Sequence, residues 1–134
     1  MSESVTDLVQ RAYSAFASGD GRALRAICDP ELEFRPVDGL GLVGDVIHGL
    51  DAACSWVQQR HSAGFSVSIW LRTLEQVSDD CVLGVGVVSE RGRTGGGYAA
   101  TVAWTWRVRD GCICSVFGYP GEADARRALS ERGC

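Results

Sequence analysis

The chain has 134 residues and a net charge of −4, from 13 basic and 17 acidic side chains, and 46% of its residues are hydrophobic. This length suits one domain with a substantial core, so we expect a single domain over residues 1–134. The acidic balance removes the electrostatic attraction on which non-specific nucleic-acid binding depends. We therefore expect no nucleic-acid partner.

No stretch of the sequence predicts a membrane partner or a cofactor. The first residues carry acids and no apolar run, and nowhere do about eighteen apolar residues follow one another, so we expect a cytoplasmic protein. The six cysteines match no zinc spacing and are expected to be small buried thiols, without a metal. The glycines at 95–97 lie between predicted strands and open no helix, so no phosphate-binding loop is expected.

The first half of the chain predicts helices, because its apolar residues recur at helical spacing. Ser4 and Asp20 are suited to cap the first two helices, and Pro30 disfavours helical geometry in the residue before it. A glycine-rich loop precedes the third. We expect helices at about 4–19, 20–29 and 50–61.

Strands are predicted elsewhere, where apolar residues alternate with period two. A strand is predicted at 32–37. Because it contains Pro36, this strand should either lie at a sheet edge or end at Pro36. Asp110-Gly111 suits the two-residue turn of a hairpin, and a short helix follows the last strand. Helices first and strands afterwards favour an α+β fold. The remaining strands should form an antiparallel meander from segments at 65–71, 82–88, 98–108 and 112–119.

Several short motifs occur in a characteristic order over nearly the whole chain. They are Tyr13-Ser-Ala-Phe16 with Gly19-Asp20, then Asp29-Pro30-Glu-Leu-Glu-Phe-Arg-Pro36, Gly49, and Arg109-Asp-Gly-Cys-Ile113 before Tyr119. This pattern resembles the SnoaL-like and ketosteroid-isomerase-like branch of the nuclear transport factor two-like superfamily. The resemblance implies a cone-shaped α+β fold with three N-terminal helices packed on a strongly curved, mainly antiparallel sheet, and a short C-terminal helix. It also implies an apolar cavity and a homodimer formed through the outer sheet face.

The chain departs from the ketosteroid isomerases at their catalytic positions. Arg35 stands where those enzymes have an aspartate base, and a guanidinium cannot accept a proton. Trp104 matches the position of their second acid, and their helix-one tyrosine falls one residue away from Tyr13. Steroid-type isomerisation is therefore not expected, and the arginine and aspartate arrangement of the limonene-epoxide-hydrolase-like branch is absent too.

Three residues are candidates for catalysis: Arg35, His61 and Tyr13. Arg35 either faces inward, where Glu33 or an anionic ligand would pair with it, or lies in solvent while its strand neighbours face the core. His61 would act as a base or cap its helix. Tyr13 would be a buried phenol in need of a hydrogen-bond partner.

Aromatic residues dominate the candidate ligand-binding set. Two of its tryptophans share a strand face, so both point into the cone or both into an interface, where they would only fill space. The proposed ligand contacts are Phe16, Glu33, Trp56, Trp104, Trp106 and Tyr119.

The residues and the resemblance together predict a SnoaL-like protein with a cavity for a small apolar or weakly anionic organic molecule. Acid–base chemistry would make it an isomerase, cyclase or hydrolase. The alternative is a non-enzymatic module for ligand binding or dimerisation, with structural tryptophans. Fold alone does not decide between them.

Overall fold

The computed structural model describes residues 4–64, 66–92 and 95–132. Phe65, which the predicted meander includes, and Cys134 lie outside these residues. The elements follow in the order α1 (Val5–Ser18), α2 (Gly21–Ile27), β1 (Cys28–Arg35), β2 (Ile47–His48), α3 (Leu50–Ser62), β3 (Ser66–Ser78), β4 (Cys81–Arg91), β5 (Gly97–Arg109), β6 (Cys112–Tyr119) and α4 (Glu122–Arg132).

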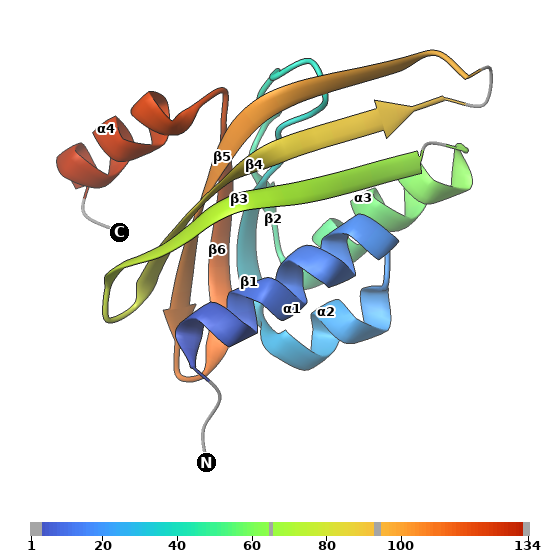
Figure 1. Cartoon of the computed structure of the whole chain (residues 1–134). Coiled ribbons are helices and arrows are strands. Elements are labelled where there is room, and N and C mark those ends of the chain that lie inside the picture. The colour runs from blue at the N-terminus through green and yellow to red at the C-terminus, as the bar shows by residue number, and fades with distance from the viewer. Residues whose placement is uncertain (1–3, 65, 93–94, 133–134) are drawn as a thin grey trace.

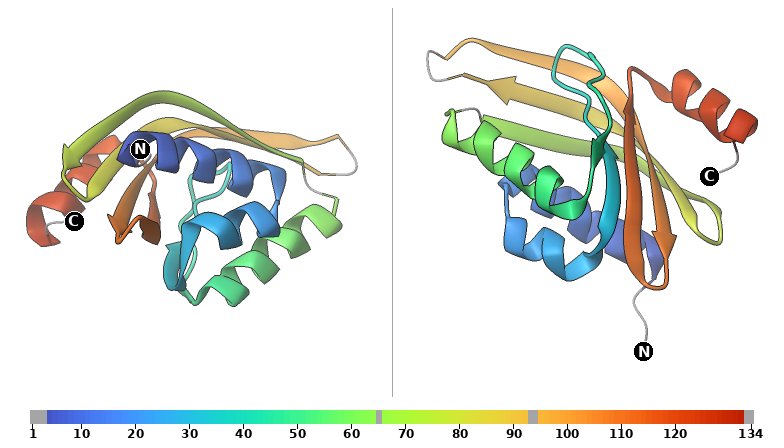
Figure 2. Two further views of the ribbon diagram at one scale, coloured as in Figure 1. Left: turned by 90° about the horizontal axis from the view of Figure 1, so that it is seen from below. Right: turned by 180° about the vertical axis from the view of Figure 1, so that it is seen from behind.

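The strands form one mixed, strongly curved and unclosed sheet in the order β2-β1-β6-β5-β4-β3. Among the strands of the described residues, β1 and β6 pair in parallel and the other neighbours are antiparallel. Helices α1, α2 and α3 lie under the concave face, whereas α4 lies on the opposite side of the sheet (Figure 1, Figure 2). The predicted α+β fold is therefore confirmed.

Local signals in the sequence set the ends of the first two helices. The backbone N–H of Asp7 donates to Ser4 Oγ over 3.1 Å, and that of Ala23 donates to Asp20 Oδ1 over 3.0 Å, so both predicted caps are present. Gly19 ends α1 with a φ of 69°, in the left-handed region that glycine adopts without strain. The three predicted helices are confirmed to within about two residues.

The first strand ends at Arg35, directly before Pro36, so the second of the two predicted alternatives for this proline is confirmed. The strand begins earlier than predicted, at Cys28 directly after α2, and it lies between β2 and β6 and not at an edge. Its pairing with β6 shifts register between Cys28 and Glu33, and Pro30 lies inside that irregularity. The missing N–H of this proline therefore interrupts no regular ladder. The edge is formed by the two-residue β2, which the sequence did not predict.

Alternation along β1 decides which of its side chains face the helices. Leu32 and Phe34 are buried in the main core, at 0% and 5% exposure, so Glu33 and Arg35 point to the outer face. A second, smaller cluster on that outer face buries the apolar side of α4. Its members are Leu83, Val85, Ala103, Tyr119 and Ala125, with Phe117, Ala128 and Leu129 at the margin.

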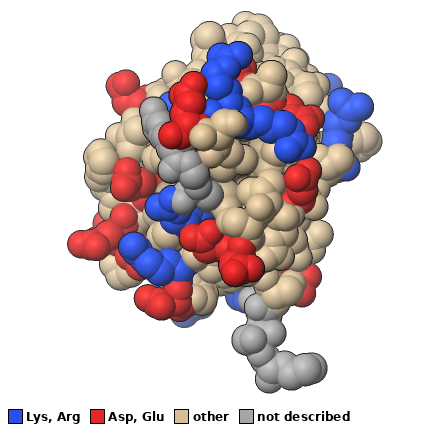
Figure 3. Space-filling view, turned by 90° about the vertical axis from the view of Figure 1, so that its left-hand side faces the viewer, with Lys and Arg blue, Asp and Glu red and all other residues tan. Residues whose placement is uncertain are grey.

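Acidic and basic side chains are interspersed on the face at the α4 end of the molecule (Figure 3). No helix in the described part of the chain is long and apolar enough to cross a membrane.

The cysteines follow the expectation of buried thiols only in part. Cys28, Cys54 and Cys114 are buried and free, whereas Cys81 is disulfide-bonded. Burial raises the pKa of the Cys28 thiol to about 12, mainly because a thiolate there would be desolvated.

We therefore expect Cys28 to stay unmodified when the folded protein meets iodoacetamide at pH 8, because the thiolate is the reacting form. Peptide mass spectrometry would check this, with the denatured protein as the control in which Cys28 reacts. Rapid labelling of Cys28 in the folded protein would contradict it.

Candidate functional site

A pocket lies between the concave face of the sheet and helices α1 and α3. The volume open to the centre of a water-sized sphere is about 70 Å³, within about 600 Å³ of empty space that includes open solvent. Most of its walls are apolar or aromatic. The lining residues are Tyr13, Phe16, Phe34, Pro36, Val37, Trp56, Val57, Arg60, His61, Val67, Ile69, Val88, Glu90, Trp104, Trp106 and Val116.

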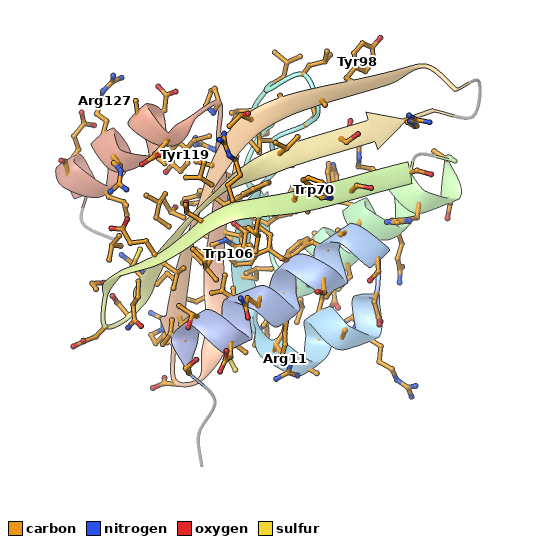
Figure 4. All side chains as sticks on the ribbon, in the orientation of Figure 1. Arg11, Trp70, Tyr98, Trp106, Tyr119 and Arg127 are labelled. Atoms are coloured by element: carbon orange, nitrogen blue, oxygen red, sulfur yellow. The ribbon has the colours of Figure 1, made fainter. Side chains whose placement is uncertain are left out.

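The deep end of the pocket is built from packed aromatic rings. Tyr13 meets Trp104 edge-on, with ring centroids 5.1 Å apart, and lies 4.6 Å from Trp106. Phe16 adds a ring 4.9 Å from Phe34. Figure 4 shows Trp106 between the sheet and α1, so this tryptophan joins the two layers at the base of the pocket. Such offset and edge-to-face pairs fix ring orientation and stabilise beyond simple burial.

The Tyr13 hydroxyl approaches the backbone of β4 at Gly84. A Cβ atom at this glycine would lie 2.1 Å from Tyr13 Oη, so only glycine leaves room for the phenol. Burial strongly raises the pKa of Tyr13, and a hydrogen bond from Trp106 to the phenol oxygen opposes the rise only in part. No acceptor among the described residues takes the hydroxyl proton. Tyr13 is therefore a neutral phenol with a hydrogen bond left to donate.

His61 lies in the last turn of α3 and also lines the pocket. Its ring packs on Gly19, where a Cβ atom would lie 2.3 Å from His61 Cδ2. Its Nε2 atom is buried and meets no hydrogen-bond partner within the described ranges. Neutral imidazole carries one nitrogen that can accept a proton, so His61 is the group in the pocket best suited to act as a base.

The pocket lining also carries an ion pair between Arg60 of α3 and Glu90 of β4. The side chains of Arg60 and Glu90 are only 26% and 13% exposed. The Arg60 guanidinium also lies over the Trp56 ring, 5.1 Å from its centroid. This pair places two opposite charges in the lining of the pocket.

The structure brings together most of the sequence-predicted site residues. Tyr13, Phe16, Trp56, His61, Trp104 and Trp106 all line this one pocket. The two strand tryptophans face inward, as one of the two interpretations of that strand required.

Arg35, Glu33 and Tyr119 lie elsewhere, on the outer face of the sheet. Arg35 donates hydrogen bonds of 3.0 and 3.3 Å to the carbonyl of Gly118, and its guanidinium is 4.7 Å from the Tyr119 ring centroid. Strand alternation causes this, because Phe34 points into the pocket and its neighbours must then point outward. The structure therefore does not bring Arg35 to the pocket.

Sequence reasoning missed Gly84, Arg60 and Glu90. A glycine inside a predicted strand is itself a signal of close backbone approach, so Gly84 could have been singled out. Nothing local links Arg60 to Glu90, since the two residues belong to a helix and a strand that meet only in the folded chain.

The family profile described as a SnoaL-like domain matches residues 9–116. The chain belongs to the SnoaL-like family. No curated protein matches it. A solved structure from Xanthomonas campestris, described as a polyketide cyclase, shares 25% identity with a TM-score of 0.68 over 85% of this chain and 87% of its own.

Two structures from Mycobacterium tuberculosis share the fold of this SnoaL-like chain at lower identity. An LEH-like epoxide hydrolase is 14% identical, with a TM-score of 0.70 over 85% of this chain and 76% of its own. RV0760c, in complex with estradiol-17beta-hemisuccinate, is 17% identical, with a TM-score of 0.71 over 87% of this chain and 94% of its own.

Proposed function

We propose that this SnoaL-like protein binds a small, mostly apolar molecule that carries a carbonyl oxygen, and catalyses proton transfer on it. One observation carries the proposal: in an otherwise apolar pocket, the buried Tyr13 hydroxyl finds no acceptor for its proton and the buried His61 Nε2 atom finds no partner among the described residues. A buried polar group left unpaired costs about 1–3 kcal/mol. A ligand that completes these hydrogen bonds recovers that free energy.

The two groups support complementary roles. Neutral His61 would take a proton from the carbon next to the carbonyl, and the electron pair of the broken C–H bond would move onto the carbonyl oxygen. The Tyr13 hydroxyl would donate to that oxygen and stabilise the enolate. Return of the proton from His61 to a different atom completes an isomerisation. In a cyclisation the enolate carbon would instead attack a second carbonyl of the same molecule, whose oxygen becomes an alkoxide and takes the proton from His61.

Hydrogen exchange tests the proposal without knowledge of the natural substrate. The probe is 2-tetralone, a two-ring ketone with acidic protons beside its carbonyl, incubated in D₂O and followed by NMR. We expect the protein to accelerate the exchange, and His61→Gln to reduce the acceleration by about a hundredfold. Binding of 2-tetralone without faster exchange would overturn the catalytic part. It would leave the second candidate, a ligand-binding module in which Trp104 and Trp106 only line the pocket.

Tyr13→Phe separates a ligand contact from a structural one. It removes the oxygen that accepts a hydrogen bond from buried Trp106, so we expect the free energy of unfolding in urea to fall by about 1–3 kcal/mol while the protein still folds. Because the phenylalanine cannot donate to a carbonyl, 2-tetralone should bind about tenfold more weakly by calorimetry. Tetralin has no oxygen and is the matched ligand, for which the affinity should not change. Equal weakening for both ligands would contradict the role assigned to Tyr13.

A cytoplasmic location and a homodimer stay part of the proposal. Cell fractionation tests the first, and light scattering after size-exclusion chromatography tests the second. Because α4 covers outer-face residues such as Val85 and Tyr119, a dimer through that face has to form beside α4 or around it. The remaining outer face includes Trp70, which is 77% exposed and labelled in Figure 4.

A further inference from the structure

The charged residues that line the pocket form a single ion pair. Among the described residues that line the pocket, Arg60 and Glu90 are the only arginine or carboxylate side chains. Their opposite charges cancel in the ion pair that they form. The walls between this pair and Tyr13 are apolar or aromatic, apart from His61. The pocket with neutral His61 therefore has a formal charge of zero.

Both partners of the ion pair are held in place by their own elements. Strand β4 is paired on both sides at Glu90, which lies opposite Val67 of β3 and opposite Tyr98 of β5. The backbone of Glu90 is therefore held inside the sheet. Arg60 lies one helical turn after Trp56, over whose ring its guanidinium rests. The pair is thus a fixed part of the pocket lining.

We propose that Glu90 is a specificity-determining residue that makes the pocket select uncharged ligands over carboxylates. The inference rests on the proposed function, since it concerns the same pocket. The Glu90 carboxylate repels a ligand carboxylate that lies near Arg60. Because the Arg60 guanidinium is already paired with Glu90, it offers such a ligand little compensating attraction. A neutral ester or ketone meets neither effect.

The test compares two probes with the same ring system, methyl 2-naphthoate and 2-naphthoate, by calorimetry at pH 8. We expect the parent protein to bind the ester at least about tenfold more tightly. Glu90→Gln keeps the shape of the side chain and removes its charge, which leaves the Arg60 cation uncompensated. This variant should bind 2-naphthoate about tenfold more tightly than the parent does, with the ester changed by less than about twofold, and the gain should shrink as salt is added.

Two further variants keep the result interpretable. Glu75→Gln removes a carboxylate that pairs with Arg126 on the surface, outside the pocket, and should leave both affinities unchanged. Arg60→Gln reverses the imbalance, so it should weaken 2-naphthoate binding further and favour 2-naphthylmethylammonium. These opposite shifts would identify charge, and not general loosening, as the cause.

The outcomes distinguish the two proposals. If the ester binds but Glu90→Gln leaves the ratio of the two affinities unchanged, Glu90 does not set specificity and the pocket still binds a ligand. If the parent protein binds 2-naphthoate as tightly as the ester, the pocket does not select uncharged ligands and the inference is wrong, although the pocket still binds a ligand. If neither the ester nor 2-tetralone binds the parent protein, the proposed function fails and the inference fails with it.

Discussion

Replacing Trp106 with alanine is expected to lower the free energy of unfolding by about 3–5 kcal/mol, a large share of the 5–15 kcal/mol that stabilises a typical domain. Trp106 is 1% exposed and is the largest fully buried side chain among the described residues. It contacts the rings of Tyr13 and Phe16, so its loss leaves a cavity between the sheet and α1. Urea denaturation followed by far-ultraviolet circular dichroism would measure the change.

Trp70→Ala is the matched control for this substitution. Trp70 has the same side chain but is 77% exposed on β3, so we expect a change within about 0.5 kcal/mol. Comparable losses in the two variants would contradict the packing of the pocket described above.

A second large effect is expected from Gly84→Ala. The new methyl group would lie 2.1 Å from Tyr13 Oη and 3.0 Å from Tyr13 Cζ, so the phenol has to move out of its place. Overpacking of this kind costs about 1–3 kcal/mol. Binding of 2-tetralone should weaken as well, because the displaced hydroxyl no longer reaches the ligand.

A double-mutant cycle tests this cause directly. In Tyr13→Phe the oxygen is absent, so adding Gly84→Ala should cost at least about 1 kcal/mol less than it does in the parent protein. Additive costs in the urea measurements would show that the alanine acts on the backbone of β4 and not on Tyr13.

Sequence reasoning worked where the cause is local. Ser4, Asp20 and Gly19 act within one helical turn, so the ends of α1 and the start of α2 could be predicted. The same holds for the last hairpin, where Asp110 and Gly111 both have positive φ, as the predicted turn requires.

The sequence was less informative where two distant segments decide the outcome. Alternation in β1 shows that Phe34 and Arg35 face opposite sides, but only contact with α3 decides which side is the core. The Arg60–Glu90 pair depends on how α3 meets β4, and the position of β1 depends on its pairing with β6. No pattern within either segment contains this information.

The parallel pairing of β1 with β6 has a consequence for how the molecule forms. Glu33 stands beside Ser115, so the first long strand of the chain finds its principal neighbour only when the last strand has been synthesised. Until then β1 has only the two-residue β2 to pair with, and the pocket lacks the wall that Val116 supplies. Pairing between strands far apart in the sequence slows folding. The entropy cost of closing the long loop between them has to be met before their contacts form and offset it. We therefore expect the wall of the pocket that β1 and β6 form together to be completed late in folding.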